Sequence, residues 1–151
     1  MTNLKFCALF LILGSLILSL GCGPQNVPPE IVAAGGTVTL NGKPLFNCQV
    51  EFIPLAKGLD GNYKAFGVTD TEGKFNLELP GSKPGCPACD CKVVVVEGPF
   101  PDEARQTNDE GAAAFMKFKK SLTNRPIPKR YQSMAKTPFK FSVADGAQFE
   151  I

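Results

Sequence analysis

Short runs of alternating apolar and polar residues occupy the chain from residue 34 onward, and turn residues separate them. Residues 36–40 alternate in this way and lead into Asn41-Gly42, a dipeptide typical of two-residue hairpin turns. In residues 48–53, Cys48, Val50 and Phe52 share one face of the pattern, and Gln49 and Glu51 lie on the other. This two-residue period predicts strands that are buried on one face.

Five later segments continue the pattern. A tight turn at residues 70–73 joins residues 63–69 to 74–79, and residues 92–97 are mostly apolar, as in a central strand covered on both faces. Residues 139–143 and 148–151 flank Asp145-Gly146 and predict a last hairpin. Seven short strands in about 115 residues predict an all-β fold, a seven-stranded antiparallel Greek-key sandwich.

A long segment, residues 98–137, interrupts the strand pattern before the predicted last hairpin. Thr107 and Glu110 have the spacing of a helix-capping box. Lysines follow where such a helix would end, which suits its dipole. The apolar residues with helical spacing are Ala112, Phe115, Met116 and Leu122. We therefore expect a partly helical insertion.

The first 21 residues have the organisation of a secretory signal peptide. Lys5 precedes an apolar run over residues 6–20, and small residues end it. The run spans 15 residues, which is short of the roughly 20 that a membrane-spanning helix needs. We therefore expect residues 1–21 to be removed on export.

A cysteine stands directly after this segment. Leu18-Ser19-Leu20-Gly21-Cys22 resembles the bacterial lipobox, in which cleavage precedes an acylated cysteine. We expect lipidation at Cys22; a thiol near an ordinary cleavage site is the alternative. Residues 22–33 are proline-rich and predict an extended tether, and residues 34–151 form the domain. The protein would be an exported, membrane-anchored lipoprotein that faces the periplasm or the cell surface.

Composition narrows the possible functions. The 151 residues include no His, which removes Ser-His-Asp hydrolases, HExxH metalloproteases and His-ligated metal sites. Lys and Arg total 16 against 14 Asp and Glu, so the overall charge does not support nucleic-acid binding. We expect no catalytic residues, no cofactor and no bound metal in the favoured interpretation.

Three motifs in order resemble one family. Residues 36–45 read G-T-V-T-L-N-G-K-P-L, residues 50–52 read V-E-F, and residues 67–75 read G-V-T-D-T-E-G-K-F. They resemble the carboxypeptidase-regulatory-like, or transthyretin-like, β-sandwich modules of bacterial envelope lipoproteins. The resemblance implies a sandwich fold and an envelope location without implying an activity. The chain departs from the family at Cys91, where the pattern has a tyrosine.

Four cysteines follow the predicted anchor: Cys48, Cys86, Cys89 and Cys91. An even number in an exported domain favours disulfides, with inert buried thiols as the other structural interpretation. Cys86 and Cys89 could close a tight loop, and strand parity buries Cys91, so a Cys48–Cys91 bridge is another pairing. The functional alternatives are a zinc or iron–sulfur site with Cys48 as fourth ligand, and a redox-active C-x-x-C.

Basic residues concentrate in the insertion, where residues 102–136 hold eight basic and four acidic side chains. The candidates for a basic interaction arm are Lys117, Lys119, Lys120, Arg125, Lys129 and Arg130. Anionic lipid, a glycan or an envelope protein would suit such an arm, whereas a solvated helix face explains it without a partner.

These observations predict a lipid-anchored, non-enzymatic envelope module with a structural or binding role. A thiol- or metal-handling envelope protein that uses the four cysteines is one alternative. A carbohydrate-binding module is a second alternative, with Tyr63 and Tyr131 but no Trp to form a sugar platform.

Replacing the predicted lipidation site tests the anchor. We expect Cys22→Ser to move the protein from the membrane fraction to the soluble fraction, because two or three acyl chains would be lost at roughly 0.8 kcal/mol per buried methylene. Fractionation with intact-mass measurement checks this. A Cys22→Ser chain that stays in the membrane at full-length mass would contradict lipidation.

Overall fold

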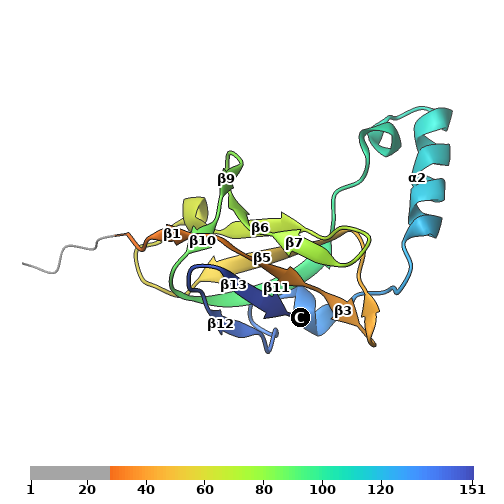
Figure 1. The fold of residues 1–151 in the computed structure, drawn as a ribbon. Coiled ribbons are helices and arrows are strands. Elements are labelled where there is room, and N and C mark those ends of the chain that lie inside the picture. The colour runs from red at the N-terminus through yellow and green to blue at the C-terminus, as the bar shows by residue number, and fades with distance from the viewer. Residues whose placement is uncertain (1–27) are drawn as a thin grey trace, which may run out of the picture.

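The computed structural model describes residues 28–151; the predicted signal peptide, Cys22 and the first part of the tether lie outside the described residues. The chain is mostly β, with several antiparallel sheets and one α-helix (Figure 1). Within residues 28–151, no helix is long and apolar enough to span a membrane.

A six-stranded antiparallel sheet is the larger layer, with strand order β12-β11-β5-β6-β8-β9. Its strands are β5 (Cys48–Pro54), β6 (Ala65–Val68), β8 (Glu78–Leu79), β9 (Lys83–Pro84), β11 (Asp90–Glu97) and β12 (Lys140–Ser142). The longest ladder joins β5 to β11 over seven residue pairs, from Cys48 opposite Glu97 to Pro54 opposite Cys91. As predicted, the mostly apolar strand in residues 92–97 has a neighbour on each side.

Three smaller sheets accompany the larger one, and the three-stranded sheet packs on it as a second layer through Phe75 and Phe149. One two-stranded sheet pairs β1 (Ile31–Val32) with β10 (Cys86–Pro87), and another pairs β3 (Thr39–Leu40) with β4 (Lys43–Pro44). The three-stranded sheet has the strand order β13-β2-β7 and consists of β2 (Ala34–Thr37), β7 (Lys74–Asn76) and β13 (Ala147–Glu150). Strand β13 runs parallel to β2. Gly36 permits this pairing, because a Cβ there would lie 2.1 Å from the carbonyl oxygen of Phe149.

Aromatic side chains join the two layers. Phe52 on β5 is fully buried, and its ring centroid lies 5.0 Å from that of Phe149 on β13 and 6.4 Å from that of Phe75 on β7. Figure 1 shows β13 lying over β5 and β11. The predicted burial of Cys48, Val50 and Phe52 on one face is confirmed, so the period-two pattern correctly located the core.

Of the two later hairpin predictions, the first is confirmed in part and the last is wrong in its pairing. The turn at Asp70 exists, with the Gly73 amide donating to the Asp70 carbonyl at 3.0 Å. In the second arm, β8 pairs with β6, with Phe66 opposite Glu78, whereas β7 enters a different sheet. Likewise, β12 pairs with β11 while β13 pairs with β2. A turn sequence fixes a local reversal, whereas the burial of both strands' apolar faces decides which sheet each strand joins. The Asn41-Gly42 hairpin between β3 and β4 is confirmed.

The insertion contains the α-helix, α2 (Asp109–Ser121), preceded by the 3₁₀ turn η2 (Asp102–Arg105). The predicted capping box is wrong, because Asn108 is the N-cap and its side chain accepts a hydrogen bond from the Gly111 amide at 2.8 Å. Asparagine caps helices at least as well as threonine. Two further 3₁₀ turns are η1 (Gly61–Tyr63) and η3 (Lys129–Gln132).

The ordered domain begins before the predicted boundary at residue 34. Ile31 and Val32 pair with Pro87 and Cys86, and Val32 is buried. The end of the predicted tether therefore packs as strand β1.

Truncating the central aromatic side chain tests the core. We expect Phe52→Ala to lower the free energy of unfolding by about 3–5 kcal/mol, because a fully buried ring leaves a cavity. Urea unfolding followed by circular dichroism measures the change. Leu55→Ala is the control, because Leu55 is 40% exposed and should change stability by less than about 1 kcal/mol. Equal losses in both variants would contradict the proposed packing role.

Candidate functional site

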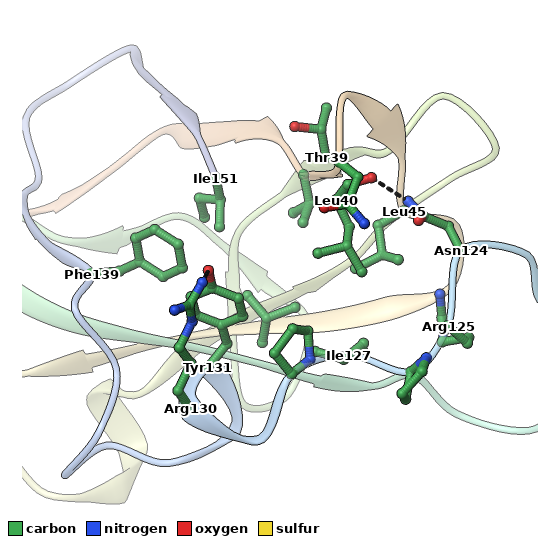
Figure 2. A pocket seen from close by; sticks show the side chains of 15 residues that line it. Thr39, Leu40, Leu45, Asn124, Arg125, Ile127, Arg130, Tyr131, Phe139 and Ile151 are labelled. Atoms are coloured by element: carbon green, nitrogen blue, oxygen red, sulfur yellow. Dashed lines mark hydrogen bonds between the residues drawn. The ribbon is translucent and has the colours of Figure 1, made fainter.

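A pocket of about 410 Å³ opens where the insertion returns to the β-domain (Figure 2). Its walls come from the β3–β4 hairpin, from β11 and from the segment between α2 and β12. The lining residues are Val38, Thr39, Leu40, Asn41, Leu45, Val95, Asn124, Arg125, Pro126, Ile127, Pro128, Arg130, Tyr131, Phe139 and Ile151. This volume is large enough to hold a small-molecule ligand or the end of a longer chain molecule.

The floor of the pocket is apolar. Val38, Leu45 and Val95 belong to the domain core, and Ile127 of the insertion is buried beside them. A ligand that displaces water from these side chains gains roughly 25 cal/mol for each Å² of apolar surface buried. The floor therefore favours the apolar part of a ligand.

Two side chains hold the insertion against the β-domain. The Asn124 amide donates to the carbonyl oxygens of Leu40 at 2.7 Å and Lys43 at 3.1 Å, and the first of these bonds is drawn in Figure 2. Arg125 forms an ion pair with Glu97 at 2.8 Å and donates to the Phe46 carbonyl at 2.8 Å. Because these bonds use its guanidinium, Arg125 positions the pocket wall.

The mouth of the pocket combines a cation with aromatic rings. Arg130 is exposed, donates to the Tyr131 hydroxyl and lies 4.6 Å from the centre of the Tyr131 ring. Tyr131 stacks on Phe139 at 5.2 Å, and Phe139 stacks on Phe141 at 6.2 Å. This aromatic row runs from the mouth into the core, so it fixes Tyr131 and places the Arg130 charge at the rim.

The cysteines do not converge on the pocket. Cys48 is buried at the Glu97 end of the β5–β11 ladder, whereas Cys91 lies opposite Pro54 at the other end. Six residues of β-strand separate the two ends, or roughly 20 Å. A Cys48–Cys91 bridge and a metal site that includes Cys48 therefore do not fit this register.

The Thr69 hydroxyl lies beside the buried Cys48 thiol. It donates to the Leu45 carbonyl at 2.6 Å and accepts from the Cys48 amide at 2.9 Å. Burial raises the pKa of Cys48, and the Thr69 hydrogen bond offsets part of this effect. Cys48 is a buried structural thiol in this environment.

The other three cysteines form a group near β1. The sulfur atoms of Cys89 and Cys91 lie 3.9 Å apart, and Cys86 is close enough to Cys91 to act on its pKa. All three are free thiols, and within residues 28–151 no set of three Cys, Asp or Glu side chains is arranged to hold a metal ion. Burial raises the pKa of Cys89 to about 12, and the Cys86 hydrogen bond together with burial raises that of Cys91.

The predicted basic arm is divided among three environments. Lys117, Lys119 and Lys120 are exposed on α2, Lys129 and Arg130 lie on η3, and Arg125 is half-buried and paired with Glu97. Arg130 is among the cations predicted from the sequence, whereas the roles of Asn124 and Phe139 are not. Asn124 lies three residues after the end of α2, but its hydrogen-bond partners lie more than 80 residues earlier in the chain.

No protein-family model, curated protein or solved structure matches this chain.

Alkylation tests the environment of the thiols. We expect native-state iodoacetamide to modify Cys89 before Cys48, Cys86 and Cys91, because Cys89 is the partly exposed member. Its rate should keep rising through pH 9, since a thiol with a pKa of about 12 is still almost fully protonated there. Peptide mapping by mass spectrometry measures each site. A Cys89 rate that levels off near pH 9, or a disulfide among these residues, would contradict the expectation.

Proposed function

We propose that this protein is a lipid-anchored, non-enzymatic binding module of the bacterial envelope and that the pocket beside Arg130 is its binding site. The observation that carries the proposal is the combination of a buried apolar floor with an exposed guanidinium at the rim. An apolar wall with a few placed polar groups is the usual composition of a ligand site.

The chemistry of the lining favours binding over catalysis. No carboxylate side chain or thiol lines the pocket, and the groups with shifted pKa values, such as Cys89 and Asp90, lie elsewhere. Catalytic sites usually place groups with shifted pKa values in the cleft. The raised pKa values of Cys89 and Cys91 also disfavour thiol chemistry at neutral pH, because the thiolate is the reactive form.

An amphiphilic anion fits the pocket best. Its apolar part would contact Leu45 and Ile127, and a carboxylate, sulfonate or phosphate would pair with Arg130 at the mouth. Arginine suits this role, since its planar guanidinium can donate two parallel hydrogen bonds to such groups. The aromatic row through Tyr131 and Phe139 would add contact area at low entropic cost.

Two sequence features support the proposed location. The resemblance of residues 36–75 to transthyretin-like modules and the lipobox-like sequence ending at Cys22 both point to the envelope. The described domain starts within a few residues of Cys22, so the proposed anchor would hold the domain close to a membrane surface.

A pair of dyes tests the ligand class. The probe 1-anilinonaphthalene-8-sulfonate has an apolar frame and one anionic group, and N-phenyl-1-naphthylamine has the same frame without the sulfonate. We expect both dyes to bind saturably, and Arg130→Ala to weaken the sulfonate dye about fivefold while leaving the neutral dye unchanged, since an exposed ion pair contributes up to about 1 kcal/mol. Fluorescence titration measures both affinities.

Lys129→Ala is the matched control, because Lys129 is an exposed neighbouring cation that does not line the pocket. It should leave both dyes unaffected. Failure of either dye to bind saturably would contradict the pocket as a ligand site. Equal weakening by Arg130→Ala and Lys129→Ala would contradict a specific role for Arg130.

A further inference from the structure

Helix α2 stands away from the β-domain, and two connecting segments join it to the rest of the chain (Figure 1). One face of the helix already has a partner. Gly111 lies against the Gln106 carbonyl, and Phe115 and Phe118 contact Phe100 with ring centroids 5.1 and 6.0 Å apart. This small cluster with η2 is the main packing that α2 receives within residues 28–151.

The opposite face of α2 is exposed along its whole length. It carries the stripe Asp109, Ala112, Ala113, Met116 and Lys120, all exposed, which recur at helical spacing. Met116 is 57% exposed, the highest value among the exposed large apolar side chains of the described chain. An apolar centre with an acid at one end and a base at the other is therefore open to a partner.

This face is complementary to itself when two copies run antiparallel. Placing Ala113 opposite Met116 of a second copy also places Asp109 opposite Lys120, because both pairs are symmetric about the same point, between Ala114 and Phe115. Glu110 and Lys117 lie on one flank of the stripe. In a twofold antiparallel pair, each flank faces the same flank of the other copy. Glu110 of one copy therefore comes within reach of Lys117 of the other.

We propose that α2 is a homodimerisation element and that a second copy of this chain covers its exposed face in an antiparallel pair. The small side chains of Ala112 and Ala113 let the helices approach closely, and Met116 of each copy fills the space beside Ala113 of the other. Four intermolecular ion pairs result, two at each end of the interface.

The contact is small, since 13 residues form a helix of about 20 Å. Interfaces of this size are typically transient in dilute solution. The experiment should therefore use the full chain in native membranes, where a lipid anchor at Cys22 would raise the local concentration. The dimer itself depends only on α2, so it can be judged separately from ligand binding at Arg130.

Photo-crosslinking identifies the occupant directly. We replace Met116 with p-benzoylphenylalanine (Met116→Bpa), irradiate the membranes and map the products by mass spectrometry. We expect a covalent dimer whose crosslink falls in residues 109–120 of a second copy. Crosslinks to lipid or to another protein, with no dimer, would overturn the proposal.

Charge reversal tests the pairing. We expect the double variant Asp109→Lys with Glu110→Lys, and the double variant Lys117→Glu with Lys120→Glu, each to lower the dimer yield at least about fivefold through like-charge repulsion. Mixing the two differently tagged variants should restore a heterodimer, because every pair is then opposite in sign. Circular dichroism of each variant confirms that the helix persists; with an intact helix, unchanged dimer yields would overturn the proposal.

A matched variant separates specific pairing from general attraction. Lys119→Glu with Lys136→Glu makes the same change in net charge as Lys117→Glu with Lys120→Glu, but neither residue belongs to the four proposed ion pairs. The Lys119 ammonium lies 5.9 Å from the centre of the Phe115 ring of its own helix, and Lys136 lies beyond η3. This variant should retain the wild-type dimer. It should also pair with the Asp109→Lys, Glu110→Lys variant less well than the Lys117→Glu, Lys120→Glu variant does, because only two of the four charge pairs are then opposite in sign. Equal heterodimer yields from these two mixtures would overturn the proposal.

Discussion

The pairing of β5 with β11 is the constraint on which the rest of the structure depends. Seven residue pairs join the two strands in the middle of the larger sheet, and the register buries Phe52 opposite Val93. The buried ring of Phe52 then contacts aromatic side chains from both layers, among them Phe75, Phe141 and Phe149. One ladder therefore sets the position of the core.

The same ladder determines where the chain places its reactive side chains. Cys48 lies at one end beside Thr69, while Cys91 lies at the other end beside Cys86 and Cys89. The separation divides the four thiols into one isolated residue and one group of three. At the Glu97 end, the ion pair with Arg125 fixes the start of the pocket wall.

The insertion between β11 and β12 has two halves with different relations to the domain. The first half folds on itself through Phe100, Phe115 and Phe118, which leaves the outer face of α2 exposed. The second half returns to the domain through Asn124 and builds one wall of the pocket. The proposed dimer contact and the proposed ligand site therefore come from one inserted segment, at a distance from each other along the chain.

Patterns among neighbouring residues were enough to predict the β-rich class, the burial of Phe52 and Cys91, the Asn41-Gly42 hairpin and a helix in the insertion. These features follow from side-chain alternation and turn chemistry, which act within a few residues. The folded chain was needed to show which sheet β7 and β13 enter, which cysteines are neighbours and that Asn124 and Arg130 border one pocket. These features depend on contacts between residues far apart in the chain, and the local pattern of one sequence does not predict which distant segments pair.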